Sequence, residues 1–171
     1  MKYALFITLI ISGCAGSSTS VKQNSYLDLT KFFSSEITKL EKLEPNVRKT
    51  VSRNGLRETK SLNNINWKSE LSLFIESDIN KSAWKNSYKI TSSKNDVIYT
   101  ALDRSLRTKR IFITRSPEGM VKRVLIVNKI SNMLYESSEE LLYITDSIYT
   151  ISKQQHVVLV GDNDYKITGV F

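Results

Sequence analysis

Residues 87–171 form a succession of short segments rich in β-branched and aromatic residues, separated by turn-forming residues. The segments are SYKIT, VIYTAL, TKRIFITR, MVKRVLIVNKI, MLYES, ELLYIT, SIYTIS, HVVLV and YKITGVF. The turns include Lys94-Asn95-Asp96, Ser116-Pro117-Glu118-Gly119 and Gly161-Asp162-Asn163-Asp164. Strands joined by such short turns pair antiparallel, whereas parallel strands need long crossover connections. The spacing therefore predicts a large antiparallel β-meander and argues against the βαβ alternation of a nucleotide-binding fold.

Two segments before this region have apolar residues at the i, i+3, i+4 spacing of an amphipathic helix. The first runs from Asp28 to Leu43, and the second from Asn64 to Ile79. Asp28 and Asn66 are suitable N-cap residues, and Pro45 prevents the first helix from continuing. The expected buried stripes are Leu29, Phe32, Phe33, Ile37, Leu40 and Leu43 in the first segment, and Trp67, Leu71, Phe74, Ile75 and Ile79 in the second.

Between these two segments lies VRKTVSRNGLRETKSL, residues 47–62, with Asn54-Gly55 at its centre. Asn-Gly between strand-like runs is the strongest short hairpin signal, because both turn residues adopt positive φ. Basic residues occupy both faces of this hairpin, which predicts a sheet edge, where charge opposes unwanted strand pairing. Contact with an anionic partner is the alternative. The predicted fold is therefore α+β: two N-terminal amphipathic helices with an intervening β-hairpin, packed on a large antiparallel β-meander.

The N-terminal stretch MKYALFITLIISGCAG contains one cation, Lys2, followed by an apolar run over residues 4–11. A transmembrane helix needs about 20 apolar residues, so this run has the length of a secretory signal instead. The run ends in Ile11-Ser12-Gly13-Cys14, which contains the only cysteine of the chain. These four residues resemble the lipobox of bacterial lipoproteins. An ordinary secretory signal with a chance cysteine, or a buried N-terminal strand, remains the alternative.

The resemblance implies that the signal is cleaved before Cys14 and that the thiol of Cys14 receives a diacylglyceryl group, usually with a further fatty acid such as palmitate on the amino group. It implies an extracytoplasmic, membrane-anchored protein, and Ala15 in place of Asp favours the outer membrane over the inner one. The polar stretch GSSTSVKQNS that follows predicts a flexible tether. The expected organisation is a signal peptide over residues 1–13, a lipidated tether over residues 14–25 and a single domain over residues 26–171.

The formal net charge of the chain is +8. For an exported protein this favours anionic lipid or the acidic face of an envelope protein as partner and disfavours nucleic acid. A candidate anion-binding surface comprises Arg104, Arg107, Lys109, Arg110, Lys122 and Arg123, because the two segments that carry most of them would be neighbouring strands. A solvated basic surface without a specific partner is the alternative.

No residue pattern predicts a catalytic, cofactor-binding or metal-binding site, and we expect no cofactor. The chain has one histidine, His156, and one cysteine, too few for a zinc site with nitrogen and sulfur ligands. Glu139 and Glu140 are adjacent, so in a strand they point to opposite faces and make a poor acid–base pair unless Asp146 or Asp103 approaches one of them. Residues 162–164 lack the spacing of a calcium loop and are expected to be a turn.

The resulting functional hypothesis is a non-enzymatic, lipid-anchored cell-envelope lipoprotein that acts as an accessory or interaction module, such as a subunit of an outer-membrane assembly. The first alternative is a carrier for a lipid or another apolar ligand, which would need a cavity between helices and sheet. The second alternative is an envelope hydrolase.

Overall fold

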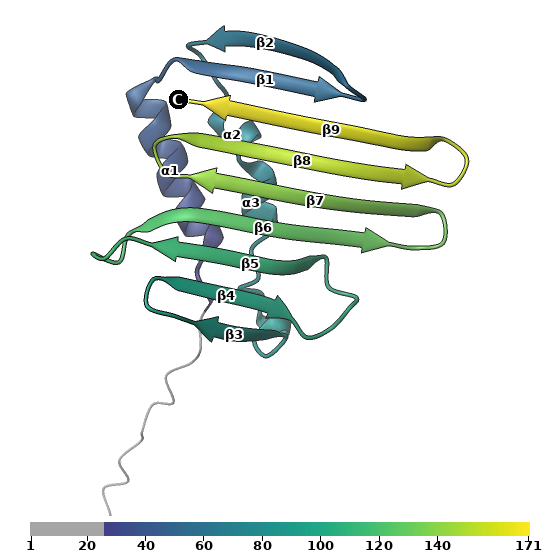
Figure 1. The fold of residues 1–171 in the computed structure, drawn as a ribbon. Helices are drawn as coiled ribbons and strands as arrows, with labels where there is room; N and C mark the ends of the chain where they lie inside the picture. Colours follow the sequence, from purple (N-terminus) through teal and green to yellow (C-terminus); the bar gives the residue numbers. More distant parts are fainter. Residues whose placement is uncertain (1–25) are drawn as a thin grey trace, which may run out of the picture.

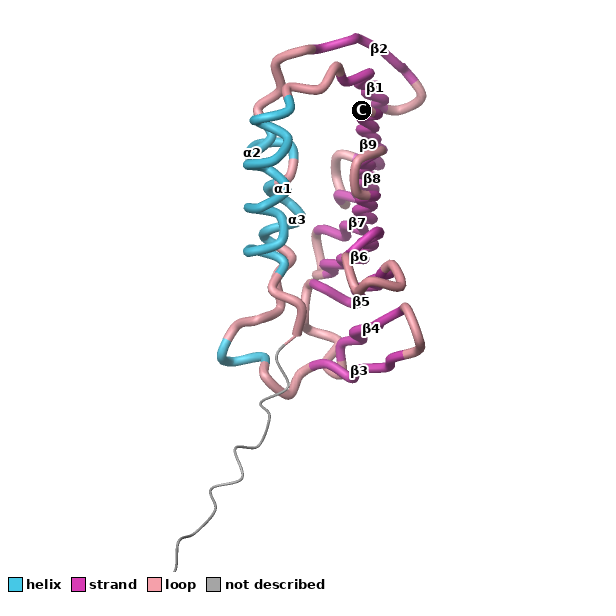
Figure 2. Tube along the Cα trace, turned by 90° about the vertical axis from the view of Figure 1, so that its left-hand side faces the viewer, coloured by secondary structure: helices cyan, strands magenta, loops and turns pink. Residues whose placement is uncertain are grey.

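The computed structural model describes residues 26–171. The predicted signal peptide, the lipobox with Cys14 and the tether over residues 14–25 lie outside the described residues and stay predictions. In the described part, a nine-stranded sheet has helices against one of its faces only (Figures 1 and 2). The elements are α1 (Leu29–Leu43), β1 (Val47–Arg53), β2 (Leu56–Leu62), α2 (Trp67–Glu70), α3 (Ser72–Glu76), a 3-10 helix η1 (Ser82–Trp84), β3 (Tyr88–Ser92), β4 (Asp96–Ala101), β5 (Thr108–Arg115), β6 (Val121–Ser131), β7 (Tyr135–Ile144), β8 (Ile148–Val157) and β9 (Gly161–Val170).

The strands lie in the order β2-β1-β9-β8-β7-β6-β5-β4-β3, and every neighbouring pair is antiparallel. The predicted meander from β3 to β9 is confirmed. The hairpin β1–β2 turns at Asn54-Gly55, where both residues have positive φ, and it joins the sheet through the pairing of β1 with β9. The charged strand β2 is consequently one edge of the sheet, as the distribution of its charges predicted.

The predicted fold class is wrong, because the chain is mainly one large sheet and does not have two N-terminal helices packed on a separate meander. The hairpin is part of the sheet, and only α1 is a long helix. The second predicted helix is broken at Leu71 into α2 and α3, of 4 and 5 residues. The Ser72 hydroxyl donates to the carbonyl of Ser69 at 3.0 Å, so a serine side chain competes for the backbone acceptors that a continuous helix would use.

A second correction concerns the β8–β9 connection. Residues 156–160 were expected to be a strand and residues 161–164 a turn, but β8 ends at Val157 and β9 already begins at Gly161. The cause is the pairing register, which places His156 opposite Asp162 and Val157 opposite Gly161. Gly161 has φ +91°, a conformation that side chains rarely adopt, so it closes the turn. The turn itself is therefore the apolar triplet 158–160.

The space between helices and sheet is filled by aromatic and aliphatic side chains. Phe33 on α1 and Phe74 on α3 are fully buried against Tyr143 of β7, with ring centroids 5.3 and 6.2 Å from the tyrosine ring. The Tyr143 hydroxyl donates to Glu36 Oε2 at 2.6 Å, which gives this buried carboxylate a partner. Burial, reinforced by the Glu36 hydrogen bond, raises the pKa of Tyr143 far above its ordinary value. The helices are thus held to the sheet by both packing and a buried hydrogen bond.

Candidate functional site

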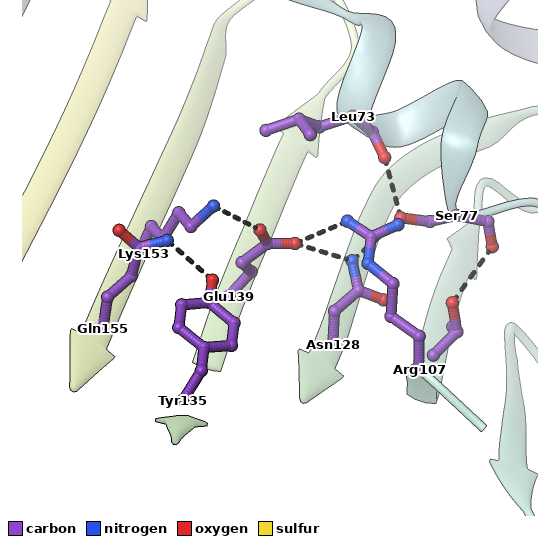
Figure 3. Close-up of polar contacts among 9 residues, drawn as sticks. Leu73, Ser77, Arg107, Asn128, Tyr135, Glu139, Lys153 and Gln155 are labelled. Atoms are coloured by element: carbon purple, nitrogen blue, oxygen red, sulfur yellow. Dashed lines mark hydrogen bonds and ion pairs between the residues drawn. The ribbon is translucent and has the colours of Figure 1, made fainter. Parts of the chain in front are cut away.

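Glu139 is the centre of a polar network on the helix-covered face of the sheet (Figure 3). Arg107 donates to its Oε2 at 2.6 Å, Asn128 to the same oxygen at 3.3 Å, and Lys153 Nζ lies 3.2 Å from its Oε1. Asn128, Glu139 and Lys153 stand directly opposite one another on β6, β7 and β8. The sheet register therefore brings this charged row together, and Arg107 reaches it from the loop before β5.

The same network ties the sheet to the helices. Asn128 Nδ2 donates to the Ser77 hydroxyl at 2.9 Å, and that hydroxyl donates to the carbonyl of Leu73 in α3 at 2.7 Å. Ser77 and Asn128 are almost fully buried. A chain of hydrogen bonds thus runs from the centre of the sheet to α3, the second half of the broken helix.

The electrostatics of Glu139 favour its ionised form. Burial by itself would raise the pKa of Glu139, but the hydrogen bonds and charges of Arg107 and Lys153 outweigh it and hold the pKa below its ordinary value. Both carboxylate oxygens are already occupied by cations. A carboxylate in this state is poorly suited to acid–base catalysis near neutral pH, and its arrangement is that of a structural ion cluster.

Replacing Glu139 by Gln is expected to lower the free energy of unfolding by about 2 kcal/mol near neutral pH, because two partly buried cations lose their counter-charge. A depressed pKa in the folded state stabilises the fold above the ordinary Glu pKa of about 4.3, and this contribution is lost as pH falls through the lower folded value. The difference in the free energy of unfolding between wild type and E139Q should therefore become smaller in acid. Urea unfolding of both proteins, from neutral pH to below the ordinary Glu pKa, measures this difference.

The matched control is Glu140→Gln, on the exposed face of the same strand. We expect its free energy of unfolding to stay within about 0.5 kcal/mol of wild type. If the difference in the free energy of unfolding between wild type and E139Q does not change with pH, Glu139 is not held ionised by Arg107 and Lys153. The opposite orientations of Glu139 and Glu140 confirm what strand alternation predicted, whereas no local signal indicated that Arg107 lies beside Glu139.

The candidate anion-binding cations do not form one surface. Arg107 is directed to Glu139, and Lys109 Nζ donates to the carbonyl of Arg104 at 2.6 Å, which closes the loop before β5. Arg104 is exposed in that loop. Two of the predicted cations are thus engaged within the chain.

The remaining three cations lie on β5 and β6. Arg110 and Arg123 share the face of the sheet that no helix of residues 26–171 covers, since both alternate with residues buried under the helices. Lys122 has the opposite phase and is exposed near the start of β6. Only Arg110 and Arg123 are therefore brought to one face as the sequence predicted, and they are joined there by Arg48 and Lys166 from β1 and β9.

The uncovered face itself carries an apolar stripe. Phe112, Leu125 and Leu142 stand opposite one another on β5, β6 and β7, and Ile144 and Ile148 pair in the adjacent row on β7 and β8. All five side chains are partly exposed. The solvated face of an antiparallel sheet is normally polar, so a stripe of large apolar side chains there is a departure that points to an interaction surface.

His156 lies at the end of the same face, in an open hollow of about 420 Å³. Its Nδ1 is 2.6 Å from Asp162 Oδ1, and the hollow is also lined by Glu136, Ser138 and Asp164. Both side chains of the His156–Asp162 pair are largely exposed. Among residues 26–171, Ser138 makes no side-chain hydrogen bond to His156, so the pair has no activated nucleophile beside it.

Within the described residues, no group of three histidine, cysteine or acidic side chains is placed to hold a metal ion. None of the helices in residues 26–171 is long and apolar enough to span a membrane. No protein-family model, curated protein or solved structure matches this chain. The uncovered sheet face, with its apolar stripe and the basic residues around it, is therefore the candidate site on structural grounds alone.

Proposed function

We propose that the protein is a non-enzymatic cell-envelope lipoprotein, anchored by acylated Cys14, that binds a protein partner through the uncovered face of its sheet. The partner would present an apolar surface with acidic residues around it and would belong to a larger outer-membrane assembly. The motif behind the N-terminal apolar run supports the anchor, and the apolar stripe supports the binding surface. Anchoring in the partner's membrane would raise the local concentration and make a weak contact effective.

The single observation that carries the partner surface is the row Phe112, Leu125 and Leu142, on the face opposite the one that the described helices cover (Figure 2). Removing such side chains from water contributes about 25 cal/mol per Å² of apolar area, so covering them favours binding. The stripe crosses strands in the middle of the sheet, where a flat surface can meet another protein. Isolated exposed apolar residues need no explanation, but a contiguous row of them does.

The charges around the stripe indicate the chemistry of the partner. In the two rows of side chains that flank the stripe on this face, six residues are basic and two, Asp96 and Glu140, are acidic. The basic residues are Arg48, Arg57, Lys89, Arg110, Arg123 and Lys166. A surface with this surplus of cations favours an acidic partner through long-range attraction and through the orientation of the encounter.

The interior supports this function over a lipid carrier. A carrier needs a volume for its ligand, and the region between helices and sheet is occupied by fully buried residues such as Phe33, Phe74, Leu40 and Tyr143. Their packing leaves an apolar ligand no room at this position.

Photocrosslinking in the native envelope tests the proposed function. A photoreactive amino acid at Leu142, in the stripe, is expected to give one main protein adduct in intact membranes. The matched control is the same amino acid at Glu41, an exposed position on α1 on the opposite side of the molecule. An adduct of equal yield from both positions, or only lipid adducts at Leu142, would rule out the sheet face as a protein-binding surface.

A further inference from the structure

Four turns emerge at one end of the sheet, which we call the tip end (Figure 1). They follow β1, β4, β6 and β8 and comprise residues 54–55, 102–107, 132–134 and 158–160. Because neighbouring strands are antiparallel throughout, these four strands all run in the same direction. Strands β6 to β9 extend beyond the helices toward this end, so their turns protrude from the body of the molecule.

The two central turns expose five large apolar side chains, two of them almost completely. The exposed fractions are 95% for Leu159, 94% for Met133, 74% for Val160, 68% for Leu134 and 54% for Val158. The backbone N–H of Val158 donates to the carbonyl of Leu134 at 3.2 Å, so the two turns lie side by side. Leu56 and Leu102 are also exposed at the two other turns of the tip end.

The stability of the fold does not explain why these turns carry large apolar side chains. Turns favour Gly, Asn, Asp and Ser, and apolar side chains in a protruding turn gain nothing from the core. They also increase the risk of aggregation, since an exposed apolar cluster attracts other surfaces. A cluster of five such side chains at the tips of two adjacent hairpins is therefore best explained by a surface that covers it.

Several backbone N–H groups at the tips donate hydrogen bonds within their own turns, which lowers the cost of moving them out of water. The N–H groups of Leu134 and Tyr135 both donate to the Asn132 side chain, at 3.0 and 2.9 Å, and the N–H of Asn132 donates to the carbonyl of Tyr135. In the other turn, the N–H of Val160 donates to the carbonyl of Val157 at 3.0 Å. Transferring an unpaired amide out of water is costly, and these internal bonds avoid much of that cost.

The charges near the tips are also compatible with a lipid surface. Residues 130–135 and 157–161 contain no charged side chain. The first ionisable side chains behind the tips are paired, with Lys129 Nζ 2.6 Å from Glu136 and His156 Nδ1 2.6 Å from Asp162. The chain as a whole has a net charge of +8, which attracts it to anionic lipid.

We propose that the tip end inserts into the interface of a lipid bilayer that contains anionic lipid. The tips are protruding turns, and their residues are aliphatic rather than the aromatic and arginine residues enriched at protein interfaces. Insertion of aliphatic side chains to the depth of the headgroups suits this shape. This contact is separate from the anchor and does not depend on acylation of Cys14.

Depth measurements on labelled protein test the insertion. Cys14 is the only cysteine, so the full chain with Cys14→Ser and Leu159→Cys carries one label at the tip and can form no thioether lipid. With vesicles of phosphatidylcholine and phosphatidylglycerol, the label at Leu159→Cys is expected to shift to bluer emission and to be quenched by brominated lipid. The control is Cys14→Ser with Glu118→Cys, in the β5–β6 turn at the opposite end of the sheet, which is expected to show neither effect.

Charge substitutions provide the second measurement. Leu159→Asp and Met133→Asp are each expected to weaken partitioning of the Cys14→Ser chain into these vesicles about tenfold. The control is Met120→Asp, another exposed methionine, in the β5–β6 turn, which should leave partitioning unchanged. Circular dichroism spectra identical to wild type verify the fold.

Equal quenching at both label positions, or no quenching at either, would overturn the proposal. So would loss of self-association in Leu159→Asp, measured by sedimentation, with vesicle binding unchanged, since the tips would then be an interface between copies of the chain. Because all proteins in these experiments lack Cys14, failure here leaves the proposed anchoring and partner surface untouched.

Discussion

Replacing Gly169 by alanine is expected to lower the free energy of unfolding by about 3 kcal/mol. Gly169 in β9 is buried opposite Tyr149 in β8, and the tyrosine ring lies over it. A Cβ at this position would be 2.1 Å from Tyr149 Cε1, far inside van der Waals contact. The ring has little freedom to move, because it is fully buried and its hydroxyl donates to Glu70 Oε2 at 2.7 Å.

The control for G169A is Gly119→Ala, where the added Cβ meets no atom within 4 Å and only the positive φ opposes the substitution. We expect that variant to lose about 1 kcal/mol. In a Tyr149→Ala background the clash is gone, so G169A should cost much less there than in wild type. Urea unfolding of the four variants measures both differences. A cost for G169A no greater than that for Gly119→Ala would mean that the ring does not lie over Gly169.

Replacing Cys14 by serine is expected to release the protein from the membrane. Serine has no thiol to acylate, and two or three acyl chains anchor a protein far more strongly than surface contacts do, because each buried CH₂ contributes about 0.8 kcal/mol. The fraction retained in membranes after a high-salt wash should fall at least about a hundredfold. Metabolic labelling with an alkyne fatty acid should label the wild-type chain and leave C14S unlabelled.

The control for C14S is Ser18→Ala, which changes a small residue after the lipobox and should retain both membrane binding and label. Intact-mass measurement of the native protein gives the decisive number. A chain that still begins at Met1 with a free thiol would remove the anchor, the compartment and the envelope partner together. The salt wash separates this anchor from the proposed tip contact, which is expected to be weaker and dependent on anionic lipid.

The two proposed contacts are compatible in one orientation. If the tip end meets the bilayer, the strands run roughly perpendicular to the membrane plane (Figure 1). The uncovered face of the sheet is then also perpendicular to the membrane and stays accessible from the side. Residues 15–25 span at most about 40 Å when extended, which limits how far from Tyr26 the anchored Cys14 can lie. A partner protein in that membrane would then find the apolar stripe accessible.

Local signals predicted several elements correctly. The i, i+3, i+4 spacing, the Asp28 cap and Pro45 delimited α1, and the Lys31 N–H indeed donates to Asp28 Oδ1 at 2.7 Å. Asn54-Gly55 located the β1–β2 turn, and the β-branched segments located the meander. These features depend on backbone preferences of a few adjacent residues, which the sequence displays directly.

Other features depended on contacts between distant residues and were missed or wrong. The apolar spacing of residues 64–79 indicated one helix, but the serine side chains compete for its carbonyls and it breaks at Leu71. The run of valines and leucine after His156 indicated a strand, but the register of β8 and β9 makes it an exposed turn. An apolar run has the same appearance in a sequence whether its side chains pack in a core or point into solvent.

The sequence by itself determined the type of local structure along most of the chain, the large antiparallel sheet and the predicted acylation motif. Only the tertiary structure decided which side chains meet. It placed Arg107 beside Glu139, 32 positions away, and it placed the described helices on one face of the sheet and the aliphatic turns at one end. The physical reason is that backbone preferences act between neighbouring residues, whereas strand register and packing act across the whole sheet. A shift of one residue in any strand would send every side chain of that strand to the other face.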